Sequence, residues 1–273
     1  MPVPTISEMF GLSGRRTVVT GAGRGIGRAI AEALAGAGAE VLVHYNTSEA
    51  AAGEVVAGIQ AAGGKAWAAQ ADVTDPAQVN ALFEQVARRW GALDILVNNS
   101  GGLIRRTKTE EMSDEELDQT LRLNINGTIC PIRAAIPLLR KGASPCIVNV
   151  SSVHAVATSA GIAAYAASKG ALLALTRAMA LEFGPDQIRV NAILPGAVDT
   201  PMLHAGLGRG HVQGSSTEEL VRGFGKKHVM GRVGRPEEIG RAILFLADNQ
   251  QSSFMTGQAM VVDGGATARL STE

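Results

Sequence analysis

The sequence contains few of the residues that mark several common classes of protein. Of its 273 residues only two are cysteines, and 4% are aromatic. Cys130 and Cys146 lack the CxxC or histidine-paired spacing of a metal or redox site, so we expect two small, buried, unpaired thiols in a reducing compartment. The five histidines show neither HxH nor HExxH spacing, which argues against a catalytic metal.

Net charge and long apolar runs are also lacking. Lys+Arg and Asp+Glu both number 25, so no excess charge points to nucleic acid or to a membrane surface. The longest apolar stretches are too short and too polar to span a bilayer. Residues 1–9 do not form the basic and apolar segments of a secretory signal. We therefore expect a cytoplasmic protein that binds neither a membrane nor nucleic acid.

What the sequence does contain is small and apolar. It is 46% hydrophobic and has 33 glycines, a composition that suits parallel strands covered by helices on both faces. Its length fits a single domain, 1–273, and shows no repeat or linker. Seven strand candidates alternate with helices, which predicts a doubly wound, seven-stranded parallel sheet of the Rossmann type. The expected strands are 16–20, 40–45, 65–70, 93–97, 147–152, 188–194 and 259–262.

A glycine-rich turn follows the first expected strand. Gly21, Gly25 and Gly27 lie between that strand and an alanine-rich helix expected at 28–37. Glycines let a backbone turn tightly and approach a pyrophosphate, whose charge the helix N-terminus meets. Glycine clusters are often only flexible turns, but the flanking strand and helix favour a phosphate-binding loop.

The end of the second expected strand bears on the choice of dinucleotide. An acidic residue there binds the ribose hydroxyls of NAD, but here Tyr45 ends the strand and no carboxylate follows until Glu49. Arg24 in the glycine turn adds a positive charge on the same side. We therefore expect NADP(H), with NAD(H) as the alternative. The neutral donors that follow Tyr45 are Asn46, Thr47 and Ser48, although Thr47 and Ser48 could instead cap the next helix.

The ends of the third and fourth expected strands carry further candidates. Asp72 could bond an adenine amino group or cap the helix expected at 76–90, and the residues alone do not separate these roles. Asn99, Ser100 and Gly101 follow the fourth strand. Small residues and amides at this edge suit close packing against a dinucleotide.

The stretch 147–169 carries the candidate chemistry. A buried strand ends in hydroxyls, including Ser152, and a helix then begins in which Tyr165 and Lys169 share one face. An ammonium beside a phenol lowers the phenol's pKa from about 10. Ser152 could hydrogen-bond the oxygen that gains or loses the proton. A Tyr followed four residues later by Lys is also common by chance.

Other segments are less distinctive. A long helix is expected at 113–140. Asn124 within it either holds a water or a backbone bend, or lowers the stability of the helix slightly without any role. The charged segment 102–116 is typical of a solvated loop and a helix start. The weakly patterned region of about 200–231 suggests a mobile lid. His154 could line a pocket or simply pack.

These residues together resemble the short-chain dehydrogenase/reductase family, in its single-domain branch. Six motifs have the family's order and spacing, from about Leu12 to Gly265, and the one departure is Ser100, where the family usually has alanine. The motifs are Thr20-Gly21-x-x-x-Gly25-x-Gly27, Asn98-Asn99-Ser100-Gly101, Asn124, Ser152, Tyr165-x-x-x-Lys169 and Pro195-Gly196.

The resemblance implies a role for each matching residue. Tyr165 would be the acid in carbonyl reduction and the base in alcohol oxidation. Lys169 would lower its pKa and bind the nicotinamide ribose, Ser152 would hold the substrate oxygen, and Asn124 would support a water of the proton relay. The implied cofactor contacts are Gly21, Arg24, Gly25, Ile26, Gly27, Asp72, Val73, Asn99, Ser100, Gly101, Pro195, Gly196, Val198 and Thr200.

The resemblance also implies substrates and assembly. The sequence is most similar to 3-oxoacyl-[acyl-carrier-protein] reductases and related NADP-dependent ketone reductases. A carrier-bound substrate would need a basic docking patch, for which 105–106 and 140–141 are candidates. A sugar or polyol dehydrogenase of the same family is the nearest rival, and a non-catalytic NADP sensor is a third possibility. Family members are commonly tetramers, so we expect a homotetramer or a dimer.

Overall fold

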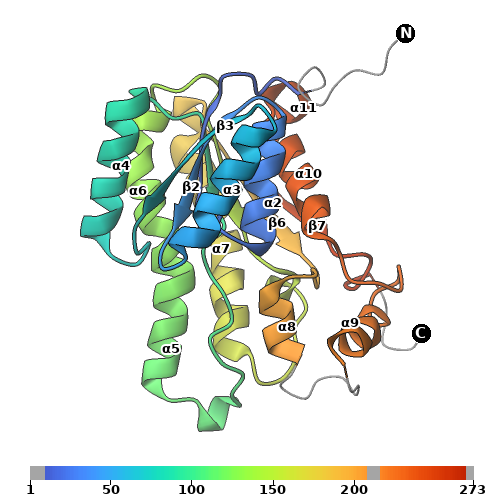
Figure 1. The fold of residues 1–273 in the computed structure, drawn as a ribbon. Helices are drawn as coiled ribbons and strands as arrows, with labels where there is room; N and C mark the ends of the chain where they lie inside the picture. The colour runs from blue at the N-terminus through green and yellow to red at the C-terminus, as the bar shows by residue number, and fades with distance from the viewer. Residues whose placement is uncertain (1–9, 208–215, 269–273) are drawn as a thin grey trace.

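A computed structural model of the chain describes residues 10–207 and 216–268 (Figure 1). Residues 1–9, 208–215 and 269–273 lie outside the described part. The expected single domain 1–273 and the expected lid at 200–231 are therefore covered only in part.

Seven parallel strands form one sheet in the order β3-β2-β1-β4-β5-β6-β7. The chain builds outward from β1 to β3, then returns to the other side of β1 with β4 and builds the other way. This confirms the predicted doubly wound α/β fold. The strands are β1 (Arg16–Val19), β2 (Glu40–Tyr45), β3 (Lys65–Gln70), β4 (Ile95–Asn98), β5 (Cys146–Val150), β6 (Arg189–Pro195) and β7 (Ala259–Val262).

Helices cover both faces of the sheet, with α2, α3 and α10 on one side and α4, α6 and α7 on the other (Figure 1). The helices are α2 (Gly25–Gly36), α3 (Glu49–Ala61), α4 (Pro76–Trp90), α5 (Asp114–Leu121), α6 (Gly127–Leu139), α7 (Ala163–Phe183), α8 (Pro201–Leu207), α9 (Thr217–Gly225), α10 (Pro236–Ala247) and α11 (Asn249–Ser252). Shorter helical segments are η1 (Thr109–Glu111), η2 (Arg122–Asn126), η3 (Val153–Ala155) and η4 (Gly184–Asp186).

Alternation along the strands divides the core into two layers. Val19 and Val43 pack under α2, α3 and α10, whereas Val18 and Leu42 pack under α4, α6 and α7. Successive side chains of a strand point to opposite faces, so a strand covered on both faces must be apolar throughout. The continuous apolar runs in the sequence are explained by this arrangement.

Several elements begin elsewhere than predicted. The helix after the glycine turn starts at Gly25 rather than residue 28. The last glycines of the turn can form its first turn because the first amides of a helix need no partner within it. β4 spans Ile95–Asn98 rather than 93–97, since the Leu93 amide bonds the Leu138 carbonyl at the end of α6. β2, β3, β7 and α4 have the predicted bounds.

The described residues of the expected lid include helices α8 and α9, and the residues that flank the lid meet. Val198 and Gly234 form a parallel bridge, in which the Asp199 amide donates to the Gly234 carbonyl at 2.8 Å and the Gly234 amide donates to the Ala197 carbonyl at 2.8 Å. The two ends of this segment therefore lie side by side, just past the end of β6.

Candidate active site

Loops after β1, β4, β5 and β6 meet at the carboxyl edge of the sheet, around the point where the strand order reverses between β1 and β4. In open α/β sheets this crevice is where ligands bind. Most of the predicted cofactor-binding and catalytic residues lie on these loops or on the helices that follow them.

The glycine turn between β1 and α2 leaves no room for side chains at two positions. Gly21 has a φ of +62°, a conformation that is costly for any residue with a Cβ. A Cβ on Gly27 would lie 2.2 Å from the Gly21 carbonyl oxygen. Because α2 begins at Gly25, its first amides lack partners within the helix and favour a phosphate there, as does the helix dipole.

Thr20 connects this turn to the end of β4. Its hydroxyl accepts hydrogen bonds from the amides of Asn99 and Ser100 at 2.9 and 3.0 Å. The Asn99 side chain donates to the carbonyls of Thr20 and Gly21 at 3.0 and 3.1 Å. The amide predicted to lie along a dinucleotide thus also holds the backbone of the glycine turn.

β5 and α7 bring Ser152, Tyr165 and Lys169 together. Lys169 Nζ lies 5.8 Å from the centre of the Tyr165 ring and donates to the Val150 carbonyl at 3.0 Å. The Ser152 side chain hydrogen-bonds the phenol of Tyr165. Ser151 points elsewhere, because its hydroxyl donates to the Lys169 carbonyl at 2.8 Å. The group expected from the sequence is therefore assembled with Ser152 as its hydroxyl.

Burial controls the protonation of this group. Burial raises the pKa of the Tyr165 phenol, and the hydrogen bond from Ser152 only partly offsets the rise. Burial lowers the pKa of Lys169 to about 8. The expected lowering of the Tyr165 pKa by Lys169 is therefore not produced by the chain's own residues, because desolvation of the phenol outweighs the other effects.

Asn124 lies at the centre of η2, a π-helical turn between α5 and α6. Its side chain accepts from the Gly102 amide and donates to the Gly102 carbonyl, both at 3.0 Å, and it also donates to the Thr120 carbonyl. The 113–140 helix is thus interrupted where Asn124 holds the loop after β4. A Cβ on Gly101 would lie 2.7 Å from Asn124 Oδ1 and 3.3 Å from Lys169 Nζ, so these residues are neighbours.

His154 and helix α8 lie beside this group and the loop after β4. The His154 ring packs edge-on against the Tyr165 ring with centres 5.9 Å apart. Burial, and to a lesser extent the charge of Arg106, lower the pKa of His154. Met202 on α8 reaches Gly102, where an added Cβ would lie 3.1 Å from the methionine methyl group. α8 therefore contacts the loop that Asn124 holds.

The residues predicted for the ribose lie at the ends of β2 and the glycine turn. Tyr45 packs partly on the core, and the Asn46 carbonyl accepts from Gln70. Ser48 occupies the N-cap position of α3 but its side chain makes no capping bond, contrary to the alternative considered above. A Cβ on Gly23 would lie 3.7 Å from the Ser48 carbonyl oxygen, which places the neighbouring Arg24 next to this corner.

The two predicted adenine contacts differ in their surroundings. Asp72 Oδ1 accepts from the amide and the hydroxyl of Thr74, both at 2.8 Å, while Asp75 caps α4. Asp72 is therefore not the cap of that helix. Val73 is 4% exposed and packs against Gly127 at the start of α6.

The loop after β6 closes the other end of the crevice. Pro195 is the last residue of β6, and Gly196 packs against Asp263 so closely that a Cβ would lie 2.8 Å from the Asp263 Cα. Thr200 lies against Gly25 of the glycine turn. Val198 is 5% exposed and packs on the core, and its predicted contact with the nicotinamide carboxamide stays a prediction.

Comparison with known proteins agrees with this geometry. A family model described as enoyl-(acyl carrier protein) reductase matches residues 21–267. The hydroxynaphthalene reductase-like protein Arp2 of Metarhizium robertsii is 40% identical over 261 residues, which span 93% of this chain and 96% of the relative. The chain belongs to the short-chain dehydrogenase/reductase family.

Two solved structures of the family are similar over nearly the whole chain. The aldohexose dehydrogenase of Thermoplasma acidophilum superposes with a TM-score of 0.85 at 33% identity, over 96% of this chain and 98% of that one. A short-chain dehydrogenase of Burkholderia cenocepacia in complex with NADP superposes with a TM-score of 0.83 at 35% identity, over 94% and 99% of the two chains. The chain is therefore an oxidoreductase of this family.

Three residues near this dehydrogenase site were not predicted from the sequence. His44 contacts the glycine turn, Gly102 bonds Asn124, and Met202 contacts Gly102. No sequence pattern marks Gly102 or Met202. His44 carried a signal, because a histidine inside an apolar strand must find hydrogen-bond partners when it is buried.

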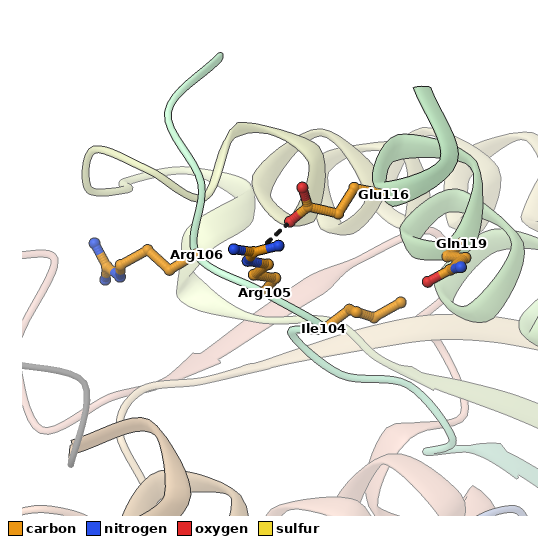
Figure 2. Close-up of a pocket in the computed structure, with 5 residues that line it drawn as sticks. All are labelled: Ile104, Arg105, Arg106, Glu116 and Gln119. Carbon is orange, nitrogen blue, oxygen red and sulfur yellow. Dashed lines mark ion pairs between the residues drawn. The ribbon is translucent and has the colours of Figure 1, made fainter. Parts of the chain in front are cut away.

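One arginine of each basic segment considered for docking forms an ion pair. Arg140 follows α6 at the amino edge of the sheet, opposite the site, and pairs with Asp186 at 2.8 Å. Arg105 pairs with Glu116 at 3.9 Å beside a cavity of about 550 Å³. Figure 2 shows Arg105 turned toward Glu116 and Arg106 turned away from it. The residues that line this cavity are Ile104, Arg105, Arg106, Glu116 and Gln119, none of them a catalytic candidate.

Residues 10–207 and 216–268 contain neither a candidate metal cluster nor a membrane-spanning helix. No group of three or more His, Cys, Asp or Glu side chains in these ranges could hold a metal ion. No helix in the same ranges has the length and apolar character needed to cross a bilayer. Cys146 is buried and Cys130 is only partly buried, and both are free thiols.

Proposed function

We propose that this protein reduces ketones with NADPH, using Tyr165 as the proton donor. The observation that carries the proposal is the assembly of Ser152, Tyr165 and Lys169 beside the crevice at the reversal of strand order. The bound dinucleotide would supply or accept a hydride at C4 of its nicotinamide. The glycine turn and the residues after β4 and β6 would hold it.

The chain's own residues account for the proton. Ser152 would donate a hydrogen bond to the substrate carbonyl and hold it at the Tyr165 hydroxyl, which transfers its proton to the oxygen that becomes the alcohol. The raised pKa of Tyr165 keeps this proton in place until the reaction occurs. Lys169 would contribute positive charge and bind the nicotinamide ribose. The water expected at Asn124 stays a prediction, since the side-chain amide of Asn124 already bonds Gly102 and Thr120.

Three observations support NADP(H) over NAD(H). Arg24 is exposed and, among the described residues, makes no ion pair. The Ser48 side chain makes no capping bond, so its hydroxyl can serve a ligand. The Burkholderia cenocepacia relative was solved with NADP. An unpaired guanidinium beside neutral donors suits the 2′-phosphate.

The cofactor preference can be tested at Arg24. Arg24→Ala should weaken NADPH binding by about ten- to a hundredfold and leave NADH binding unchanged, because only NADPH carries the 2′-phosphate. Arg28→Ala is the matched control, since Arg28 lies one turn along α2 and pairs with Glu32 at 2.8 Å. Fluorescence titration measures both constants. Equal losses for the two dinucleotides would contradict the assignment.

The substrate proposed is an apolar ketone that is not bound to a carrier. Val156 and Met202, at 59% and 56% exposed, are large apolar side chains near the site. A sugar would need several polar groups from the lid, yet in α8 the polar side chain is His204, which bonds Asp199 at 2.6 Å. The Thermoplasma relative is an aldohexose dehydrogenase, whereas the Metarhizium relative is named for a hydroxynaphthalene.

Assembly and the lid complete the proposal. Leu117 on α5 and Leu181 on α7 are 36% and 81% exposed, and these helices would pair across subunits of a tetramer or a dimer. The segment closed by the Val198–Gly234 bridge would act as the lid that excludes water from the site. A cytoplasmic location is part of the same proposal.

The deciding experiment follows NADPH and NADH oxidation with a panel of ketones. The panel contains aromatic and cyclic ketones, diketones, β-ketoacyl thioesters and sugar lactones. We expect turnover with NADPH and apolar ketones, and a fall of at least about a hundredfold in Tyr165→Phe and Ser152→Ala. Ser151→Ala, which changes the neighbouring hydroxyl, should stay within about fivefold of the wild type.

Two outcomes would contradict the proposal in different ways. Wild-type turnover in Tyr165→Phe would exclude Tyr165 as the acid. Binding of NADPH without turnover of any ketone would support the cofactor site but favour a sensor that binds the dinucleotide without chemistry.

A further inference from the structure

A buried histidine joins the glycine turn to the residue that follows β3. His44 on β2 is 1% exposed. Its Nδ1 accepts a hydrogen bond from the Gly21 amide at 3.1 Å, and its Nε2 lies 2.9 Å from the Ala71 carbonyl. Its own carbonyl accepts from the Ala22 amide at 2.9 Å. One residue thus contacts two consecutive amides of the glycine turn and the backbone just before Asp72.

These partners determine the state of the ring. The Gly21 amide can only donate, so Nδ1 must be the bare nitrogen, and the Ala71 carbonyl can only accept, so Nε2 must carry the hydrogen. Burial lowers the pKa of His44, which agrees with a neutral ring. A second proton on Nδ1 would face the Gly21 N–H and remove its acceptor.

Gly21 has an unusual backbone conformation, and both its amide and its carbonyl are hydrogen-bonded by side chains. Gly21 adopts a φ of +62°, and the Asn99 side chain donates to its carbonyl at 3.1 Å. The peptide on each side of Gly21 is therefore held by a side chain. The Gly21 amide is partly buried, and an amide shielded from water without an acceptor is costly, so without His44 this peptide would turn to find another partner.

We infer that His44 is a positioning residue for the dinucleotide, which sets the orientation of the Gly21 peptide and couples the phosphate-binding turn to the Ala71–Asp72 corner. This inference rests on the proposed function. The residue touches neither the catalytic group nor the substrate side. Its loss should therefore weaken cofactor binding and leave the chemistry at Tyr165 unchanged.

Two substitutions separate the two hydrogen bonds. In His44→Asn, Oδ1 takes the place of Nδ1 and can accept from Gly21, but the donor to Ala71 is lost. In His44→Gln, the side-chain amide reaches Ala71 and the acceptor for Gly21 is lost. Each variant loses one of two buried hydrogen bonds, so the two should lose similar thermal stability.

The measurements are the Kd for NADPH by fluorescence titration, the KM for NADPH, and kcat at saturating NADPH. We expect His44→Gln to raise Kd and KM by roughly tenfold, the effect of one lost hydrogen bond to a partly buried amide. His44→Asn should stay within about threefold. In both variants kcat should stay within about twofold of the wild type.

Equal Kd values in the two variants, or a fall in kcat at unchanged KM, would overturn the inference, because a purely structural histidine would affect both variants alike. If His44→Gln does not fold, a Kd in His44→Asn raised tenfold or more would overturn it too, and a Kd within threefold would support it. Failure of the proposed function would be distinct, since the wild type itself would then not bind NADPH or would not turn over.

Discussion

Single residues of this site owe their chemistry to burial more than to neighbouring charge. Lys169 is 4% exposed, and desolvation lowers its pKa to about 8. Desolvation raises the pKa of Tyr165. Both shifts favour the neutral form, as a low-dielectric surrounding requires. The phenol thus keeps its proton, while the ammonium is only moderately stable as a cation.

The pH dependence of ketone reduction follows from the lysine. If charged Lys169 supports the reaction, kcat/KM should be constant between pH 6 and about 7 and fall as the pH rises through about 8, where Lys169 loses its proton. The limiting fall should approach about tenfold per pH unit. Initial rates with NADPH and an apolar ketone measure this profile. A constant kcat/KM up to about pH 9.5 would exclude the dependence on Lys169.

Single elements depend on contacts that the local sequence does not reveal. The segment between α5 and α6 is a π-helical turn because Asn124 bonds the Gly102 backbone and thereby joins the helix to the loop after β4. π-turns inside α-helices often occur at functional sites. This turn brings the loop to the catalytic group.

Replacement of Asn124 tests this connection. Asn124→Ala should lower the free energy of unfolding by about 2–3 kcal/mol, because it is fully buried and its loss leaves the Gly102 amide without its acceptor. Turnover should fall as well, since Gly101 adjoins Lys169. Urea unfolding and steady-state rates measure the two effects.

Asn126 provides a control in the same turn. It is exposed, so Asn126→Ala should change the free energy of unfolding by no more than about 0.5 kcal/mol. Similar losses in the two variants would mean that the π-turn itself, and not the bond to Gly102, stabilises this region.

The molecule as a whole has a different kind of polar centre at each edge of the sheet. The carboxyl edge holds the site, and the amino edge holds Asp94, whose carboxylate accepts hydrogen bonds from the Arg16 guanidinium and from the amides of Arg16 and Ala143. Burial raises the pKa of Asp94, but these hydrogen bonds outweigh burial and hold the pKa below its ordinary value. The starts of β1, β4 and β5 are joined there.

Asp94 should therefore make stability depend on pH. A carboxylate whose folded pKa lies below its unfolded value stabilises the fold above the unfolded pKa, and that contribution is lost as the pH falls through the folded pKa. Asp94→Asn should lower the free energy of unfolding by about 3 kcal/mol at pH 7, and the deficit should shrink below about pH 4.

Urea unfolding at pH 7 and at pH 4 or below would measure the deficit. Asp186→Asn is the control, because Asp186 lies at the same edge in an exposed pair with Arg140 and should change stability by less than about 1 kcal/mol. A deficit for Asp94→Asn that did not vary with pH would show that its charge contributes nothing.

Much of the fold and of the candidate site could be predicted from local pattern. The bounds of β2, β3, β7 and α4 agree because apolar periodicity, proline and capping residues are local signals. The spacing of Tyr165 and Lys169 was sufficient to predict their common face, since helix geometry is local too.

What the sequence by itself determined is the order of its elements and the residues available at the carboxyl end of each strand. Only the tertiary structure decided which of these meet, how deeply each is buried, and that His44, Gly102 and Met202 join them. The physical reason is that desolvation and hydrogen bonding depend on distance in space. The sequence does not distinguish a buried lysine such as Lys169, whose pKa is about 8, from an exposed lysine with an ordinary pKa.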